Sequence, residues 1–160
     1  MELSSNSGIL DTILGLPTHP LLVHGAVVLL PLTALLAAWV AWRPSAWVRA
    51  SAPLTALTVA LAGLAFATAQ AGEKLAARLG DPERIHAHEE IGERVPLLAV
   101  LLVICAAAMW ALSRRQTQPG TAERVLALVT TVVALTVMVW TIRAGHTGAE
   151  SVWGPVVGNL

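Results

Sequence analysis

Four long apolar runs constrain this 160-residue chain more than any other feature of it. They cover about residues 21–42, 52–72, 95–112 and 123–143, and each falls in the range of roughly 17–25 residues with which a helix crosses a bilayer. Only 12% of the residues are charged, against about 25% in soluble domains. The sequence therefore predicts an all-α integral membrane protein, a four-helix bundle that forms a single domain over residues 1–160 within a lipid bilayer.

The segments that flank these runs predict two further helical pieces. Residues 9–14 place their aliphatic side chains on one helical face, which is compatible with a short interfacial helix at the N-terminus. No Lys or Arg occurs in residues 1–20, so a signal peptide is not expected and the first run is a retained span. The stretch Gly80–Glu83 stops one helix and starts the next, so the third helix should begin near Pro82 and bend near Pro96.

Four alternating spans place both termini and the link after the second span on one side of the membrane. All five histidines and nine of the ten acidic residues fall on that side. The links on the other side are short and dense in arginine, which favours the cytoplasm. We therefore expect a multi-pass protein of the cell membrane whose termini and histidine cluster are extracytoplasmic.

Helical periodicity divides the polar stretch that precedes the third span. At about 100° per residue, His88 and Glu89 share a face with small residues such as Gly92, whereas His86 shares a face with bulky aliphatic residues. His88 and Glu89 should therefore point into the bundle and His86 outward. One end of every other span adds an inward group, which gives the set His24, Glu73, His88, Glu89 and His146.

Imidazole and carboxylate groups from four helices suit a transition metal ion or a haem iron. As a metal site, the ligands would come from His24, Glu73, His88, Glu89 and His146, although Glu89 could instead orient a ligating imidazole. As a b-type haem site, His24, His88 and His146 would be the ligands and Arg143 would pair with a propionate. The choice between metal ion and haem b stays open, and the role is electron transfer or metal handling, with a redox protein as a possible partner.

Two alternatives involve no cofactor. The polar cluster could lock the helices of a non-enzymatic structural or accessory membrane protein, or its histidine and carboxylate groups could relay protons. The sequence has no phosphate-binding loop, no G-x-S-x-G, no H-E-x-x-H and no C-x-x-C, so it assigns no catalytic residue and no covalent haem. A net charge of zero argues against nucleic-acid binding.

Three segments of the chain resemble the motifs of a prokaryotic membrane family, domain-of-unknown-function family 2231. They are HPLLVHGAVVLLPLTAL (19–35), HEEIGE (88–93) and GHTGAESVWG (145–154), and they occur in the family's order and spacing. The chain departs from the family at Gly25-Ala26, where Phe-Pro is commoner. The resemblance implies a four-span bundle and singles out His19, His24, His88 and His146. Some related proteins join this domain to cytochrome c-like modules, which implies redox chemistry outside the cytoplasmic membrane.

Overall fold

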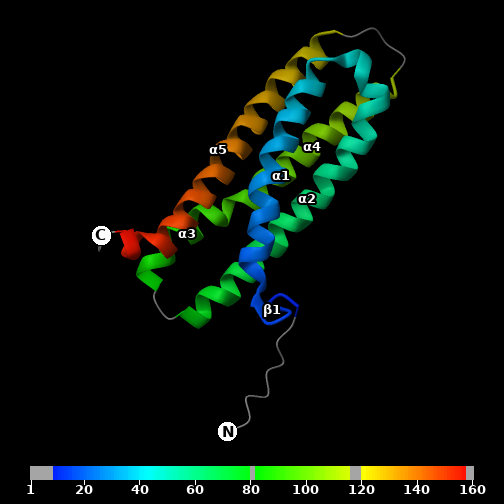
Figure 1. The fold of residues 1–160 in the computed structure, drawn as a ribbon. Coiled ribbons are helices and arrows are strands. Elements are labelled where there is room, and N and C mark those ends of the chain that lie inside the picture. The colour runs from blue at the N-terminus through cyan, green and yellow to red at the C-terminus, as the bar shows by residue number, and fades with distance from the viewer. Residues whose placement is uncertain (1–8, 80–81, 116–119, 158–160) are drawn as a thin grey trace.

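The computed structural model describes residues 9–79, 82–115 and 120–157, and most of them lie in one elongated helical bundle (Figure 1). Its helices are α1 (Thr18–Ala41), α2 (Pro44–Leu79), α3 (Pro82–Gly92), α4 (Arg94–Ser113) and α5 (Thr121–Val157). Four stretches are long and apolar enough to cross a membrane: Thr18–Ala41, Pro44–Arg78, Ile85–Ser113 and Thr121–Gly154. The predicted all-α membrane bundle is therefore confirmed.

The two longest helices continue well beyond the predicted spans. α2 has 36 residues and α5 has 37, so each is about 55 Å long, against a hydrocarbon core of roughly 30 Å. The predicted spans stopped where the apolar runs stop, near Gly72 and Arg143. Polar residues end a membrane span without ending a helix, and both helices therefore project past their spans at the end where the termini lie (Figure 1).

The third predicted helix begins at Pro82 as expected and is interrupted once, between α3 and α4. Pro96 has no N–H with which to bond the carbonyl of Gly92, so one main-chain hydrogen bond of the helix is missing at this point. Glu93 nevertheless keeps helical dihedral angles, and its N–H bonds the carbonyl of Glu89 at 2.9 Å.

The interfacial helix expected at the N-terminus is wrong, because this segment is a small antiparallel hairpin. β1 (Thr12–Ile13) pairs with β2 (Leu16–Pro17). Leu14 and Gly15 form the turn with φ angles of +52° and +82°, and positive φ at both positions is what a two-residue hairpin turn of this kind requires. The hairpin is fastened to α2 through Asp11, whose carboxylate lies 2.9 Å from Nη2 of Arg78.

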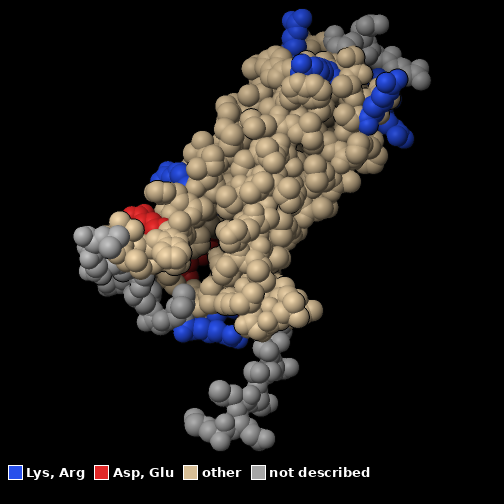
Figure 2. Space-filling model, viewed as in Figure 1, with Lys and Arg blue, Asp and Glu red and all other residues tan. Residues whose placement is uncertain are grey.

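Small side chains fill the interior of the bundle. Ala34, Ala37 and Ala41 of α1 and Ala99 and Ala106 of α4 are almost completely buried. Small residues let helix backbones approach closely, which is how helices associate in lipid. Larger aliphatic side chains cover the outside, and the middle of the face in view carries no charged residue (Figure 2).

A two-histidine cavity at one end of the bundle

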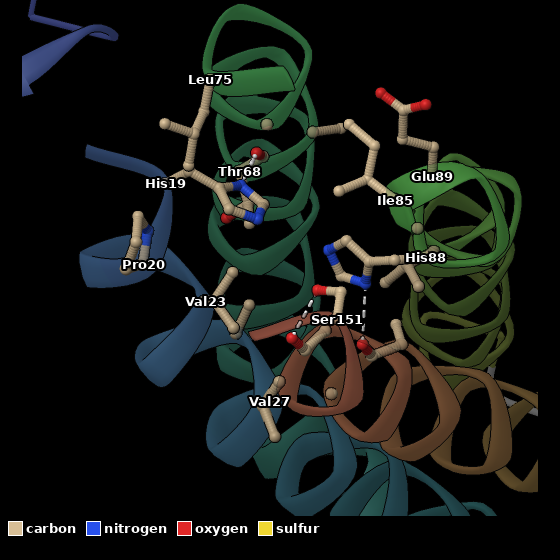
Figure 3. A pocket seen from close by; sticks show the side chains of 18 of the residues that line it. His19, Pro20, Val23, Val27, Thr68, Leu75, Ile85, His88, Glu89 and Ser151 are labelled. Carbon is tan, nitrogen blue, oxygen red and sulfur yellow. Dashed lines mark hydrogen bonds between the residues drawn. The ribbon is translucent and has the colours of Figure 1, made fainter. Parts of the chain in front are cut away.

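A cavity of about 430 Å³ lies at the end of the bundle where the termini are found. α1, α2, α3 and α5 line it together with the start of α4 (Figure 3). Most of the lining residues are apolar, and many of them are alanine, glycine or valine. Two imidazole rings, those of His19 and His88, stand out in this apolar wall.

His19 enters the cavity from the first turn of α1. Because the helix begins at Thr18, His19 shares a helical face with Val23 and Val27, which also line the cavity. Its Nδ1 bonds the main-chain carbonyl of Thr68 in α2 at 2.8 Å. The ring also packs on Gly72, where an added Cβ would lie 2.9 Å from Cε1 of the imidazole.

His88 enters from α3 on the inward face that helical periodicity predicted. Its Nδ1 bonds the main-chain carbonyl of Ala144 in α5 at 3.0 Å. The ring packs on Gly148, where an added Cβ would again lie 2.9 Å from Cε1. His86 and Glu90 are exposed, as expected for the opposite face.

Both imidazoles are therefore held in the same way. Each bonds a carbonyl of a neighbouring helix and packs on the glycine four residues later, Gly72 after Thr68 and Gly148 after Ala144. In an α-helix the residue at i+4 lies one turn above the carbonyl of residue i. Glycine at that position leaves room for a planar ring beside the carbonyl.

The hydrogen bonds fix which nitrogen of each ring carries the proton. A carbonyl oxygen only accepts, so Nδ1 is the donor in both rings, and Nε2 of a neutral imidazole then has a free lone pair. The ring centroids are 5.9 Å apart and the ring planes are inclined by 72°. The Nε2 atoms are on the sides of the rings that face the space between them (Figure 3).

Carboxylates surround the cavity without completing a metal-ion site. Glu73, Glu89 and Glu93 all line it, with Glu89 half-buried and the other two exposed. Within residues 9–79, 82–115 and 120–157, no group of three or more His, Cys, Asp or Glu side chains is placed to hold a metal ion. The geometry brings together two imidazoles and leaves the carboxylates at the periphery.

The other predicted ligands lie at the edge of this cavity or outside it. His24 lines the cavity but is exposed, and its Nδ1 is directed to the carbonyl of Pro20 in its own helix. His146 is exposed and is not among the lining residues. Arg143 is also exposed, with its guanidinium 5.6 Å from the ring centre of Trp140.

The placement of His146 differs from the expected one because α5 does not end at Arg143. The sequence predicts a fourth span that ends near Arg143, with His146 as the inward group at that end. The Gly145–Gly148 segment is instead regular helix, and His146 falls on the exposed face with Ile142 and Glu150. The predicted ligand set omits His19, which precedes the predicted first span at about residue 21. Extending that helix by one turn would have placed His19 with Val23 and Val27.

The comparisons place the chain in a family. Residues 15–160 match the family described as "Predicted membrane protein (DUF2231)". The chain belongs to the DUF2231 family. The match covers all five helices of this DUF2231 protein and all of its histidines. No curated protein and no solved structure matches the chain.

Proposed function

We propose that this DUF2231 protein binds one b-type haem between His19 and His88 and transfers electrons through it. The observation that carries the proposal is the pair of imidazoles with free Nε2 lone pairs on opposite sides of one cavity. Histidines that ligate a metal usually donate their other N–H to a carbonyl or carboxylate, and both rings meet that condition.

The number of available ligands favours haem over a bare metal ion. Protein sites for bare transition-metal ions usually hold the ion with three or four side chains. Among the described residues no three such side chains converge, because His24 and the glutamates that line the cavity lie at its edge and only His19 and His88 face each other. A haem iron needs only axial ligands from the protein, because the macrocycle supplies the rest. Two metal–imidazole bonds of about 2 Å each, together with the distance from each Nε2 to its ring centre, need slightly more than the 5.9 Å between the centroids, so the rings would move apart slightly around a shared metal.

The size and lining of the cavity also favour haem. A volume of about 430 Å³ lies within the range of roughly 300–1,000 Å³ that is typical of cofactor sites. Its alanine and glycine residues leave space for a flat, apolar macrocycle. Thr141 also lines the cavity, and its buried hydroxyl has no hydrogen-bond partner in the described part of the chain. Imidazole on both sides of the iron would leave no position for dioxygen, so electron transfer is the role that suits such a site.

The test is an absorption spectrum of the purified protein with haem supplied during expression. A Soret band and stoichiometric iron are expected in the wild type, and both should be lost in His19→Ala and in His88→Ala. His86→Ala and His146→Ala are matched controls, because both side chains are exposed, and they should keep the band. No haem in the wild type, or equal loss in all four variants, would overturn the proposal.

A second candidate function is supported by the same hydrogen bonds. His19 ties α1 to α2, and His88 ties α3 to α5, so the pair could fasten the bundle of a structural or accessory membrane protein. This candidate predicts that His19→Ala and His88→Ala lower the thermal stability of protein that contains no cofactor. It also predicts that added haem does not change the stability of the wild type.

We also propose the cell membrane as the location, with the termini and the cavity on the extracytoplasmic side. Arg43, Arg49, Arg114, Arg115 and Arg124 lie at the opposite end, where the positive-inside rule favours the cytoplasm. Electron transfer would then involve a redox protein that approaches the cavity from outside the cell membrane.

A further inference from the structure

A shallow apolar groove runs between α4 and α5 at the end of the bundle opposite the histidine cavity. It is lined by Ala108, Ala111 and Leu112 of α4, by Arg115 just after α4, and by Ala122, Val125, Leu126 and Val129 of α5. Seven of these eight lining residues are apolar, and the charged one, Arg115, lies two residues after the end of α4. The groove follows about two turns of each helix, or roughly 10 Å.

The surroundings of the groove are basic. Arg114 and Arg115 follow the last residue of α4, Arg124 lies in the first turn of α5, and all three are exposed. Glu123 is the nearby acid among the described residues, and its Oε2 already accepts a hydrogen bond from the N–H of Gly120 at 2.6 Å. Blue side chains accordingly gather at this end in Figure 2.

The level of the groove in the membrane identifies the kind of ligand. α4 and the apolar part of α5 are candidate spans, so their joined ends lie where the hydrocarbon meets the headgroups. Exposed Trp39, Trp42 and Trp110 lie toward the same end, and tryptophan marks this boundary. An occupant must therefore be apolar along its length and anionic at its end.

We propose that this groove binds an anionic phospholipid, with one acyl chain against the alanines of α4 and α5 and the phosphate at Arg115 and Arg114. Basic pockets between membrane helices are known to bind lipid headgroups in this manner. The site is independent of the histidine cavity, because its lining residues include none of those that line the cavity.

The experiment is native mass spectrometry of the intact protein in detergent with added phosphatidylglycerol or phosphatidylcholine. Phosphatidylglycerol should bind with at least tenfold preference, and Arg115→Gln should weaken its binding about fivefold, the effect of one arginine near a lipid surface. Arg49→Gln is the matched control, because Arg49 is exposed at the same end but belongs to α2, and it should bind like the wild type. Ala111→Trp should block the groove and reduce binding without changing the charge.

Three results would overturn the proposal. Equal binding of the two lipids would show that the arginines do not select an anionic headgroup. Equal losses of phosphatidylglycerol binding in Arg49→Gln and Arg115→Gln would show that the lipid responds to general surface charge and not to this groove. Full competition by free glycerol phosphate would show an anion site that does not use the groove. Helix content by circular dichroism and elution in size-exclusion chromatography establish that each variant is folded before its binding is compared.

Discussion

A glycine placed four residues after a carbonyl determines where each cavity imidazole can lie. At Gly72 and at Gly148, the nearest side-chain atoms to an added Cβ would be those of His19 and His88, at 2.9 Å. Unstrained structures avoid so short a contact, and each ring is also held by its hydrogen bond to the carbonyl below. A methyl group must therefore displace the ring and weaken that bond.

We predict that Gly72→Ala and Gly148→Ala each abolish haem binding and each cost about 1 kcal/mol, the net value of a hydrogen bond, relative to an alanine substitution at an unhindered helical glycine. Gly63→Ala is the control on the same helix as Gly72, because an added Cβ there meets nothing within 4 Å. It should leave haem binding intact and stabilise the helix by up to ~1 kcal/mol. Thermal denaturation in detergent, followed at 222 nm and at the Soret band, measures both effects.

The proposed site also predicts how haem binding depends on pH. The iron needs neutral Nε2 atoms, so protons compete with iron for both imidazoles. The affinity for haem should be highest at neutral pH and should fall on acidification, as protons displace iron from Nε2. A Soret titration between neutral and mildly acidic pH measures this. An affinity for added haem that does not fall between neutral and acidic pH would contradict bis-histidine ligation.

At the residue scale, periodicity predicted one imidazole of the pair and missed the other. His88 was placed correctly because the small residues of its face and the aliphatic residues of the opposite face identify the inward direction. The directions in which the side chains of His19 and His146 point depend on where α1 begins and where α5 ends. Apolar runs do not mark those boundaries when the helix projects beyond the membrane.

At the scale of elements, the N-terminal hairpin positions the start of α1 and therefore His19. Thr18, the residue before His19, donates its hydroxyl to the carbonyl of Ile9 at 2.7 Å and its N–H to the carbonyl of Asp11 at 3.2 Å. The carboxylate of Asp11 is 12% exposed and lies 2.9 Å from Arg78 and 3.8 Å from Lys74 at the end of α2. The hairpin thus connects the ends of α1 and α2 beside the cavity.

We predict that Asp11→Asn loosens this connection while the bundle stays folded. An ion pair of this exposure contributes up to ~1 kcal/mol, so the amide of Thr18 should exchange its hydrogen up to about fivefold faster. Hydrogen exchange followed by mass spectrometry on a peptide that contains residues 12–20 measures this. Lys74→Gln is the control, because the ion pair of Lys74 with Asp11 is longer, and it should change the exchange rate less. Equal exchange rates in Asp11→Asn and the wild type would contradict the prediction.

The hairpin also shows what helical periodicity cannot reveal. Ile9, Ile13 and Leu14 have a helical spacing, yet Gly15 and Pro17 interrupt any helix and favour a turn. The spacing of a few aliphatic residues is a weak signal over so short a segment. The spanning helices are predicted by a different signal, the length of their apolar runs.

At the scale of the whole molecule, the two halves of the chain build the cavity in equivalent ways. The first half offers His19 from α1 to a carbonyl and a glycine of α2, and the second half offers His88 from α3 to a carbonyl and a glycine of α5. The cavity therefore forms only when both helix pairs are packed together. A ligand held by both histidines would join the halves, and its binding should raise the thermal stability of the entire bundle.

The distribution of arginine predicts the direction in which this bundle is inserted. The two ends carry equal numbers of Lys and Arg, five each, but the end without histidines concentrates its five arginines in the short links after α1 and α4 and the adjacent helix turns. Short, arginine-dense links stay in the cytoplasm. In a variant with Cys105→Ala, Ser45→Cys should therefore react with a membrane-impermeant thiol reagent only after the cells are opened. Glu150→Cys, exposed at the cavity end, should react in intact cells, and the reverse pattern would place the cavity and any redox partner in the cytoplasm.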